Sequence, residues 1–149
     1  MKHFHLYCSS SDSSHTYPYN SSNDFIVDLN REIDLEGHGW EVALSELTYQ
    51  GDAESATQLL VCCDLVVESF VEGRYVTILR RINVLHKTQV NMRYVTLQYI
   101  PLKGPTVKQL RIYITDLEGR PSNIGPNRTL CTLHFRQSPQ HGCQLARPL

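Results

Sequence analysis

Histidine offers the broadest chemistry in this chain, because two of its seven histidines are separated by a single residue. His3 and His5 flank Phe4, and His134 lies in a distant segment of alternating apolar and polar residues. On a β-strand, residues i and i+2 point to the same side, so His3 and His5 form a His-x-His pair. Cupin-like enzymes bind metal through such a pair, a following glutamate and a distant histidine.

The expected glutamate is absent, since Cys8, Ser9 and Ser10 occupy the positions where it should follow. Ligands of a catalytic metal also need supporting residues that hold them rigidly, and a strand at a chain end supplies few. We therefore expect no catalytic metal and no cofactor. A cupin-like enzyme is for this reason the third of three candidate functions.

Other catalytic patterns are also missing. The sequence contains no Gly-x-Ser-x-Gly motif and no Gly-rich phosphate loop, and the run Ser9–Ser14 has the composition of a loop. Cys131 and His134 are three residues apart, which places them on opposite faces of a strand. We predict that the protein is not an enzyme.

The cysteines indicate buried thiols rather than a metal site or a disulfide framework. Their number is odd, and no Cys-x-x-Cys pair occurs. Cys62 and Cys63 are adjacent and would face opposite sides of a strand. Most of the five are predicted to be buried and free; they are Cys8, Cys62, Cys63, Cys131 and Cys143.

The segments that must position these residues have the period of β-strands. Alanine is scarce, whereas valine, isoleucine, threonine and tyrosine are plentiful, and turn signals separate short alternating runs. About eight strands are expected, and the one weak helix candidate is Asp52–Leu59. The predicted strands are His3–Ser9, Asp24–Asn30, Trp40–Tyr49, Thr57–Val67, Arg74–Val84, Met92–Ile100, Val107–Thr115 and Thr129–Arg136.

Eight such strands predict an all-β fold, a single eight-stranded jelly-roll β-sandwich. The chain has 149 residues, 41% of them hydrophobic and 19% charged, which is ordinary for one globular domain. We assign residues 1–136 to that domain and residues 137–149 to an extended or disordered tail. No apolar run approaches a membrane span, and Met1–His5 lacks the apolar stretch of a signal peptide, so we expect neither membrane association nor secretion.

Two sets of segments resemble one protein family over nearly the whole chain up to Arg136. The most specific parts are Gly39-Trp40-Glu41-Val42-Ala43-Leu44-Ser45-Glu46-Leu47-Thr48-Tyr49 and the closing Leu133-His134-Phe135-Arg136. Together they resemble the minor capsid (penton) proteins of Polinton/Maverick elements and adintovirus-like DNA viruses. After Tyr49 this chain is shorter than the family pattern, because Gln50-Gly51-Asp52 leads almost at once to Thr57.

The resemblance implies a structural capsid protein of the virion, without enzymatic activity, that forms a homopentamer at icosahedral vertices and assembles inside the host cell. Its partners would be further copies of itself and a major capsid protein. The N-terminus has no Lys/Arg-rich arm and no basic stripe interleaved with aromatic residues, so we expect no direct contact with nucleic acid.

Arg136 and the tail are the candidates for contact with a neighbouring subunit, because the tail has no place in an eight-stranded sandwich. The residues assigned to this interface are Arg136, Cys143, Leu145 and Arg147. The second candidate function is a receptor- or ligand-binding trimeric jelly roll of the tumour-necrosis-factor kind. Such trimers are secreted or membrane-anchored, and neither signal is found in this sequence.

The charges are divided between the two halves of the chain. Residues 1–72 contain 13 acidic and two basic residues, and residues 73–149 contain 12 basic and two acidic residues. Opposite charges across a ladder stabilise it and like charges destabilise it, so the division favours ladders that join the halves, as in a jelly roll. Alternatively, the two signs lie on opposite flanks and drive ring closure between subunits, or are simply solvated.

If the ladders do join the two halves, the expected neighbours are Asp24 and Asp28 with Lys108 and Arg111, Glu41 with Arg93, and Asp64 and Glu68 with Arg74 and Arg80.

Overall fold

A computed structural model describes residues 2–50, 58–84, 89–122 and 127–139. Over these ranges the chain forms strands, turns and loops, and no helix is present that is long and apolar enough to cross a membrane. The strands are β1 (His3–Ser9), β2 (Asp24–Asp34), β3 (Trp40–Gln50), β4 (Gln58–Cys63), β5 (Ser69–Val71), β6 (Arg74–Val76), β7 (Ile78–Asn83), β8 (Gln89–Arg93), β9 (Ile100–Pro101), β10 (Thr106–Thr115) and β11 (Leu130–Gln137).

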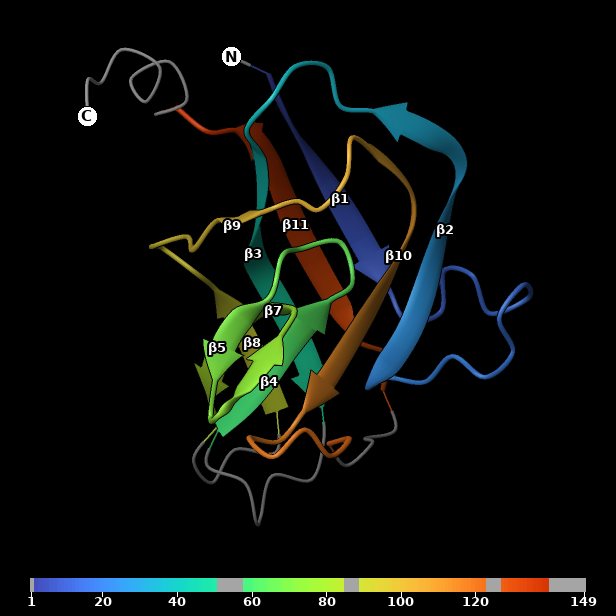
Figure 1. Ribbon diagram of the computed structural model, residues 1–149. Coiled ribbons are helices and arrows are strands. Elements are labelled where there is room, and N and C mark those ends of the chain that lie inside the picture. Colours follow the sequence, from blue (N-terminus) through green and yellow to red (C-terminus); the bar gives the residue numbers. More distant parts are fainter. Residues whose placement is uncertain (1, 51–57, 85–88, 123–126, 140–149) are drawn as a thin grey trace.

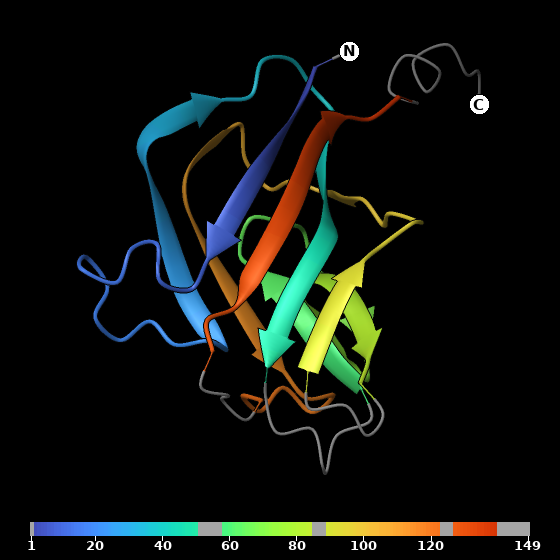
Figure 2. The same ribbon diagram turned by 180° about the vertical axis from the view of Figure 1, so that it is seen from behind.

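The strands form two antiparallel sheets that pack as a sandwich. Sheet A has the order β1-β11-β3-β8, with the short β9 also paired to β3, and sheet B has the order β2-β10-β4-β7. Figure 1 views the molecule with sheet B toward the reader, and Figure 2, turned by 180°, shows β1, β11, β3 and β8 of sheet A in front. In each sheet, strands from the start of the chain alternate with strands from its end. This is the strand order of a jelly roll, so the predicted all-β sandwich is confirmed, but the described residues form eleven strands rather than the eight predicted.

Several predicted strand limits differ from the structure. Arg74–Val84 is divided into β6 and β7, and Met92–Ile100 is wrong as a single strand, because β8 ends at Arg93 and β9 begins at Ile100. The chain leaves the ladder at Tyr94, whose backbone N–H donates to the Ser45 carbonyl (2.9 Å). Of the weak helix candidate, Asp52–Thr57 lies outside the described residues, and Gln58 and Leu59 belong to β4.

The core lies between the two sheets and is built from alternate residues of each strand. Phe25, Leu44, Ile112, Leu133 and Phe135 are among its fully buried side chains. Full burial of each such side chain contributes about 1.5–3 kcal/mol to folding. Because strand side chains alternate, the same packing fixes which residues of β1 and β11 face outward.

A β-bulge shifts the alternation within β3. Thr132 of β11 pairs with Glu46, but the next residue, Leu133, pairs with Leu44, so Ser45 is the extra residue. As a result Leu47 and Tyr49 face the core. Glu46 lies on the other face from Leu44, although simple alternation along Trp40–Tyr49 would put both on one face. Glu46 instead forms an ion pair with Arg93 (3.8 Å).

Four of the five cysteines lie in the described part of the chain, and all four are buried and free. Cys8, Cys63 and Cys131 belong to the main core, whereas Cys62 faces the opposite side of β4. There Cys62 packs in a smaller cluster that includes Val71 and Val76 of the β5–β6 hairpin. The prediction of buried thiols, with Cys62 and Cys63 on opposite faces, is therefore confirmed for these residues.

Every ladder between two described strands joins residues 1–72 to residues 73–149, as the divided charge predicts. Asp24 accepts two hydrogen bonds from the Arg111 guanidinium, at 2.8 and 2.9 Å. The ion pairs Glu41–Arg136 and Glu46–Arg93 also join the two halves. Opposite charges therefore meet across three of these ladders, which supports the topological interpretation of the division.

Other expected charge pairs are wrong in detail. Glu41 pairs with Arg136 at 2.9 Å rather than with Arg93, because the register places Arg93 opposite Glu46. Arg74 and Arg80 donate instead to the carbonyl oxygens of Leu117 and Thr96. The sequence predicted which halves meet, but the register decided which charges touch.

We expect a double-mutant cycle on Asp24→Ala and Arg111→Ala to give a coupling free energy of about 0.2–1 kcal/mol, measured by urea unfolding. The coupling should fall as salt is raised, because both side chains are about half exposed. Glu46→Ala with Arg93→Ala serves as the matched control, since that pair is longer (3.8 Å) and Arg93 is 81% exposed. A coupling near zero for Asp24–Arg111 would contradict a stabilising role of this pair, and an equal coupling for the control would contradict the dependence on the shorter distance.

Candidate functional site

The candidate site lies on the outer face of sheet A, where β1 and β11 pair. The register places His5 directly opposite His134, and His3 opposite Arg136. Phe4 packs against the core with its ring stacked on that of the fully buried Phe135, at 4.8 Å between centroids. Alternation along both strands therefore directs all three histidines to the other side. The core packing of this ladder thus determines where the imidazoles meet.

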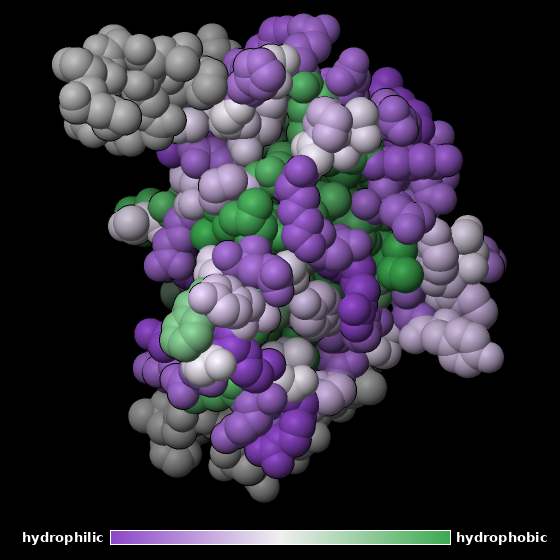
Figure 3. Space-filling view, viewed as in Figure 1, coloured by the Kyte–Doolittle hydropathy of each residue, from purple (hydrophilic) through white to green (hydrophobic). Residues whose placement is uncertain are grey.

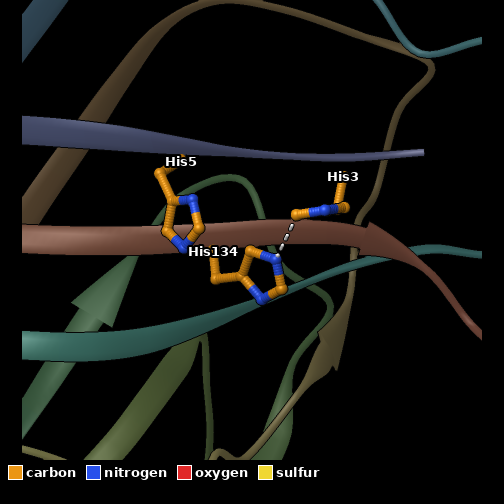
Figure 4. Close-up of side chains that lie close together, drawn as sticks. All are labelled: His3, His5 and His134. Carbon is orange, nitrogen blue, oxygen red and sulfur yellow. Dashed lines mark hydrogen bonds between the residues drawn. The ribbon is translucent and has the colours of Figure 1, made fainter.

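The three imidazoles form one cluster, although His134 is far from the other two in sequence (Figure 4). Nδ1 of His3 lies 3.0 Å from Nε2 of His134, and the rings of His5 and His134 stack with centroids 4.5 Å apart. One ring nitrogen from each residue lies within 4.8 Å of the other two. His3 and His5 are exposed, and His134 is partly buried.

Tyr99 and Arg136 border the cluster. The Tyr99 hydroxyl is hydrogen-bonded to Nδ1 of His134 (2.7 Å), and the Arg136 guanidinium lies over the Tyr99 ring at 3.5 Å from its centroid. Arg136 also donates to Glu41 at 2.9 Å. Tyr99 and Glu41 thereby orient the side chains of His134 and Arg136 on the outer face of β11.

The electrostatic environment favours neutral imidazole at His134. Partial burial lowers the pKa of His134, and the neighbouring His5, His3 and Arg136 lower it further. Near neutral pH the His134 ring therefore has one unprotonated nitrogen, whose lone pair can accept a hydrogen bond or bind a metal ion. Which nitrogen carries the proton depends on the hydrogen bond that the other makes.

The predicted interface residues are only partly described. Arg136 lies at the site, with 28% of its side chain exposed, and it is engaged by Glu41 and Tyr99 within the chain. Its role in a subunit contact stays a prediction. Cys143, Leu145 and Arg147 lie outside the described residues. Before that region, β11 extends through Gln137, and the Ser138 N–H donates to the Gly39 carbonyl.

None of the described cysteines belongs to the histidine cluster. Cys131 is buried on the core side of β11, on the opposite face from His134, and its hydrogen bond with Cys8 and its burial raise the pKa of its thiol. A separate groove between the edge strands β7 and β8 includes Arg80 and Arg81 in its lining. There the Arg80 guanidinium packs over the Tyr94 ring at 4.0 Å.

Sequence reasoning identified the three histidines as possible metal ligands but missed Tyr99 and Glu41. The sequence placed Tyr99 in a predicted strand, Met92–Ile100, but the structure is irregular from Tyr94 to Tyr99, so alternation could not give the direction of this side chain. Glu41 was assigned to a different arginine. The alternation of β3 does place Glu41 on the outer face, and only the register adds Arg136.

Comparison with protein-family models and with curated proteins finds no match to this chain.

The described thiols should be unreactive in the folded protein. Burial raises the pKa of Cys62 to about 12, and it also raises the pKa of Cys63, so thiolate is scarce near neutral pH. In a Cys143→Ser variant, we expect Ellman's reagent at about pH 8 to modify the four described thiols only as the chain unfolds. Guanidinium-denatured protein is the control. Rapid reaction of the native variant would contradict the buried positions.

Proposed function

We propose that this protein is a structural capsid subunit, a penton-like single jelly roll that assembles as a homopentamer at icosahedral vertices. One observation carries the proposal. The two most specific sequence blocks of the resemblance form β3 and β11, which are paired neighbours within a jelly roll. Leu133 pairs with Leu44 and Phe135 with Val42, so the residues of both blocks build one part of the core.

The interior also supports a structural role. Its clustered side chains are aliphatic, aromatic or thiol groups, and no aspartate, glutamate or histidine is among the buried side chains of the described residues. The histidine cluster faces outward, on an open sheet surface, rather than into an enclosed cavity as a cupin-like reaction would need. A jelly roll with a buried, largely apolar interior can act through its outer surface.

The proposed partners are further copies of this chain and a major capsid protein, within a virion assembled inside the host cell. The proposal includes no enzymatic activity, no direct contact with nucleic acid and no membrane contact. The alternative, from a different functional class, is a trimeric ligand-binding jelly roll. The number of subunits distinguishes the two, because the alternative predicts three and the capsid proposal five.

The β5–β6 hairpin offers a surface for contact with another copy. Phe70 and Tyr75 are 66% and 70% exposed, and their rings meet edge to face at 5.3 Å. The hairpin lies over sheet B in Figure 1. Elsewhere on the face shown in Figure 3, hydrophobic side chains reach the surface in separate places between hydrophilic ones. Aromatic side chains that are exposed on a free subunit are typical of surfaces that become buried at the centre of a protein interface.

We expect native mass spectrometry and negative-stain images of the purified chain to show pentamers, closed rings or shells without added nucleic acid. The range of pH and salt should be wide, because charged contacts between subunits weaken with salt. A trimer would favour the ligand-binding alternative. A monodisperse monomer at high concentration under all conditions would contradict the proposal.

We expect the double substitution Phe70→Ser and Tyr75→Ser to weaken assembly at least about tenfold, because aromatic anchors dominate interface energies. Analytical ultracentrifugation measures the change. Tyr19→Ser is the matched control, since Tyr19 is 97% exposed and lies in the loop between β1 and β2. Equal assembly of wild type and double variant would exclude the hairpin as a contact.

A further inference from the structure

We propose that His3, His5 and His134 bind one divalent transition-metal ion, such as Zn²⁺, on the outer face of β1 and β11. The proposal does not rest on the capsid function, and it assigns the ion no reaction. It concerns residues that a single pairing register brings together from the two ends of the described chain.

The nitrogen positions fit a metal ion with small adjustments. Zinc binds imidazole nitrogen at about 2.0–2.1 Å, so tetrahedral ligands lie about 3.3 Å apart. Nδ1 of His3 and Nε2 of His134 are 3.0 Å apart, and one nitrogen from all three residues lies within 4.8 Å of the others. His3 and His5 are exposed, so rotation about their side-chain bonds can close this difference without disturbing the core.

Tyr99 supplies the supporting hydrogen bond that metal-binding histidines need. A ligating imidazole donates its other N–H to a nearby acceptor, which fixes the tautomer and orients the ring. The Tyr99 hydroxyl oxygen lies 2.7 Å from Nδ1 of His134. With Nδ1–H donating to Tyr99, the lone pair on Nε2 points to the side where His3 approaches (Figure 4).

The donor set selects the kind of ion. Three imidazoles suit Zn²⁺, Co²⁺, Ni²⁺ or Cu²⁺, whereas Ca²⁺ and Mg²⁺ require oxygen ligands, and no carboxylate of the described residues belongs to this cluster. The charge of Arg136 would oppose a cation, but Glu41 lies 2.9 Å from it and balances that charge. Three protein ligands leave one position for water or for a donor from another molecule.

Bound metal would fasten β1 to β11. Among the described strands, β1 is an edge strand that pairs with β11 alone, so the ion would link the start of the fold to its last strand. Metal that binds only the folded chain raises the melting temperature in proportion to the logarithm of its concentration.

The test uses the untagged full chain, freed of metal with a chelator and then dialysed. Titration with Zn²⁺ by calorimetry should show one ion per chain, and Co²⁺ should give the visible absorption bands of a low-coordinate site. We expect each of His5→Ala and His134→Ala to weaken binding at least about 100-fold, and Tyr99→Phe to weaken it about 10–100-fold. His15→Ala is the matched control, because His15 is exposed and lies outside the cluster.

Circular dichroism and melting in the presence of chelator will establish that each variant is folded. The proposal is overturned if folded His5→Ala and His134→Ala bind Zn²⁺ as tightly as wild type, or if His15→Ala loses as much affinity as they do. It is also overturned if wild type binds no Zn²⁺ or Co²⁺ in the micromolar range. Unchanged affinity in Tyr99→Phe would contradict the supporting hydrogen bond.

Discussion

The pairing of β11 with β1 on one side and β3 on the other is the interaction on which the rest of the structure depends. It joins the last described strand to the first, and it buries Leu133 and Phe135 in the centre of the core. Contacts between distant parts of a chain are entropically costly to close, so they must be strongly stabilised once formed. The apolar inner face of β11 supplies that stabilisation, and sheet A cannot be complete without it.

The register of this ladder also separates two kinds of chemistry. On the inner side, Cys8 and Cys131 meet among apolar side chains that keep both thiols from water. On the outer side, His5 and His134 meet in a half-exposed, polar surrounding. A slip of one residue would exchange the faces, so the core that specifies the register also specifies the histidine cluster.

The sequence predicted most of the fold because period-two alternation is directly visible in a chain that lies half in the core. It could not predict the bulge at Ser45, since an extra residue changes the phase without changing residue types, and simple alternation along Trp40–Tyr49 therefore puts Glu46 on the wrong face. The histidines could be named from spacing, but their meeting depends on a register between residues 5 and 134. The sequence placed Tyr99 in a predicted strand, Met92–Ile100, that the structure interrupts between Arg93 and Ile100, and only the tertiary structure shows the hydrogen bond of Tyr99 to His134.

A jelly roll by itself does not determine function, because capsid proteins, lectins and cupins share it. These classes differ in where polar side chains gather. In the described part of this chain, the side chains between the sheets form a buried, largely apolar core, whereas the histidine cluster and the exposed aromatic pair of the β5–β6 hairpin lie on outer faces. Such a distribution favours contact with other molecules over conversion of an enclosed substrate. The divided charge serves the fold itself, because acidic residues of the first half of the chain form ion pairs with arginines of the second half across the ladders of the sandwich.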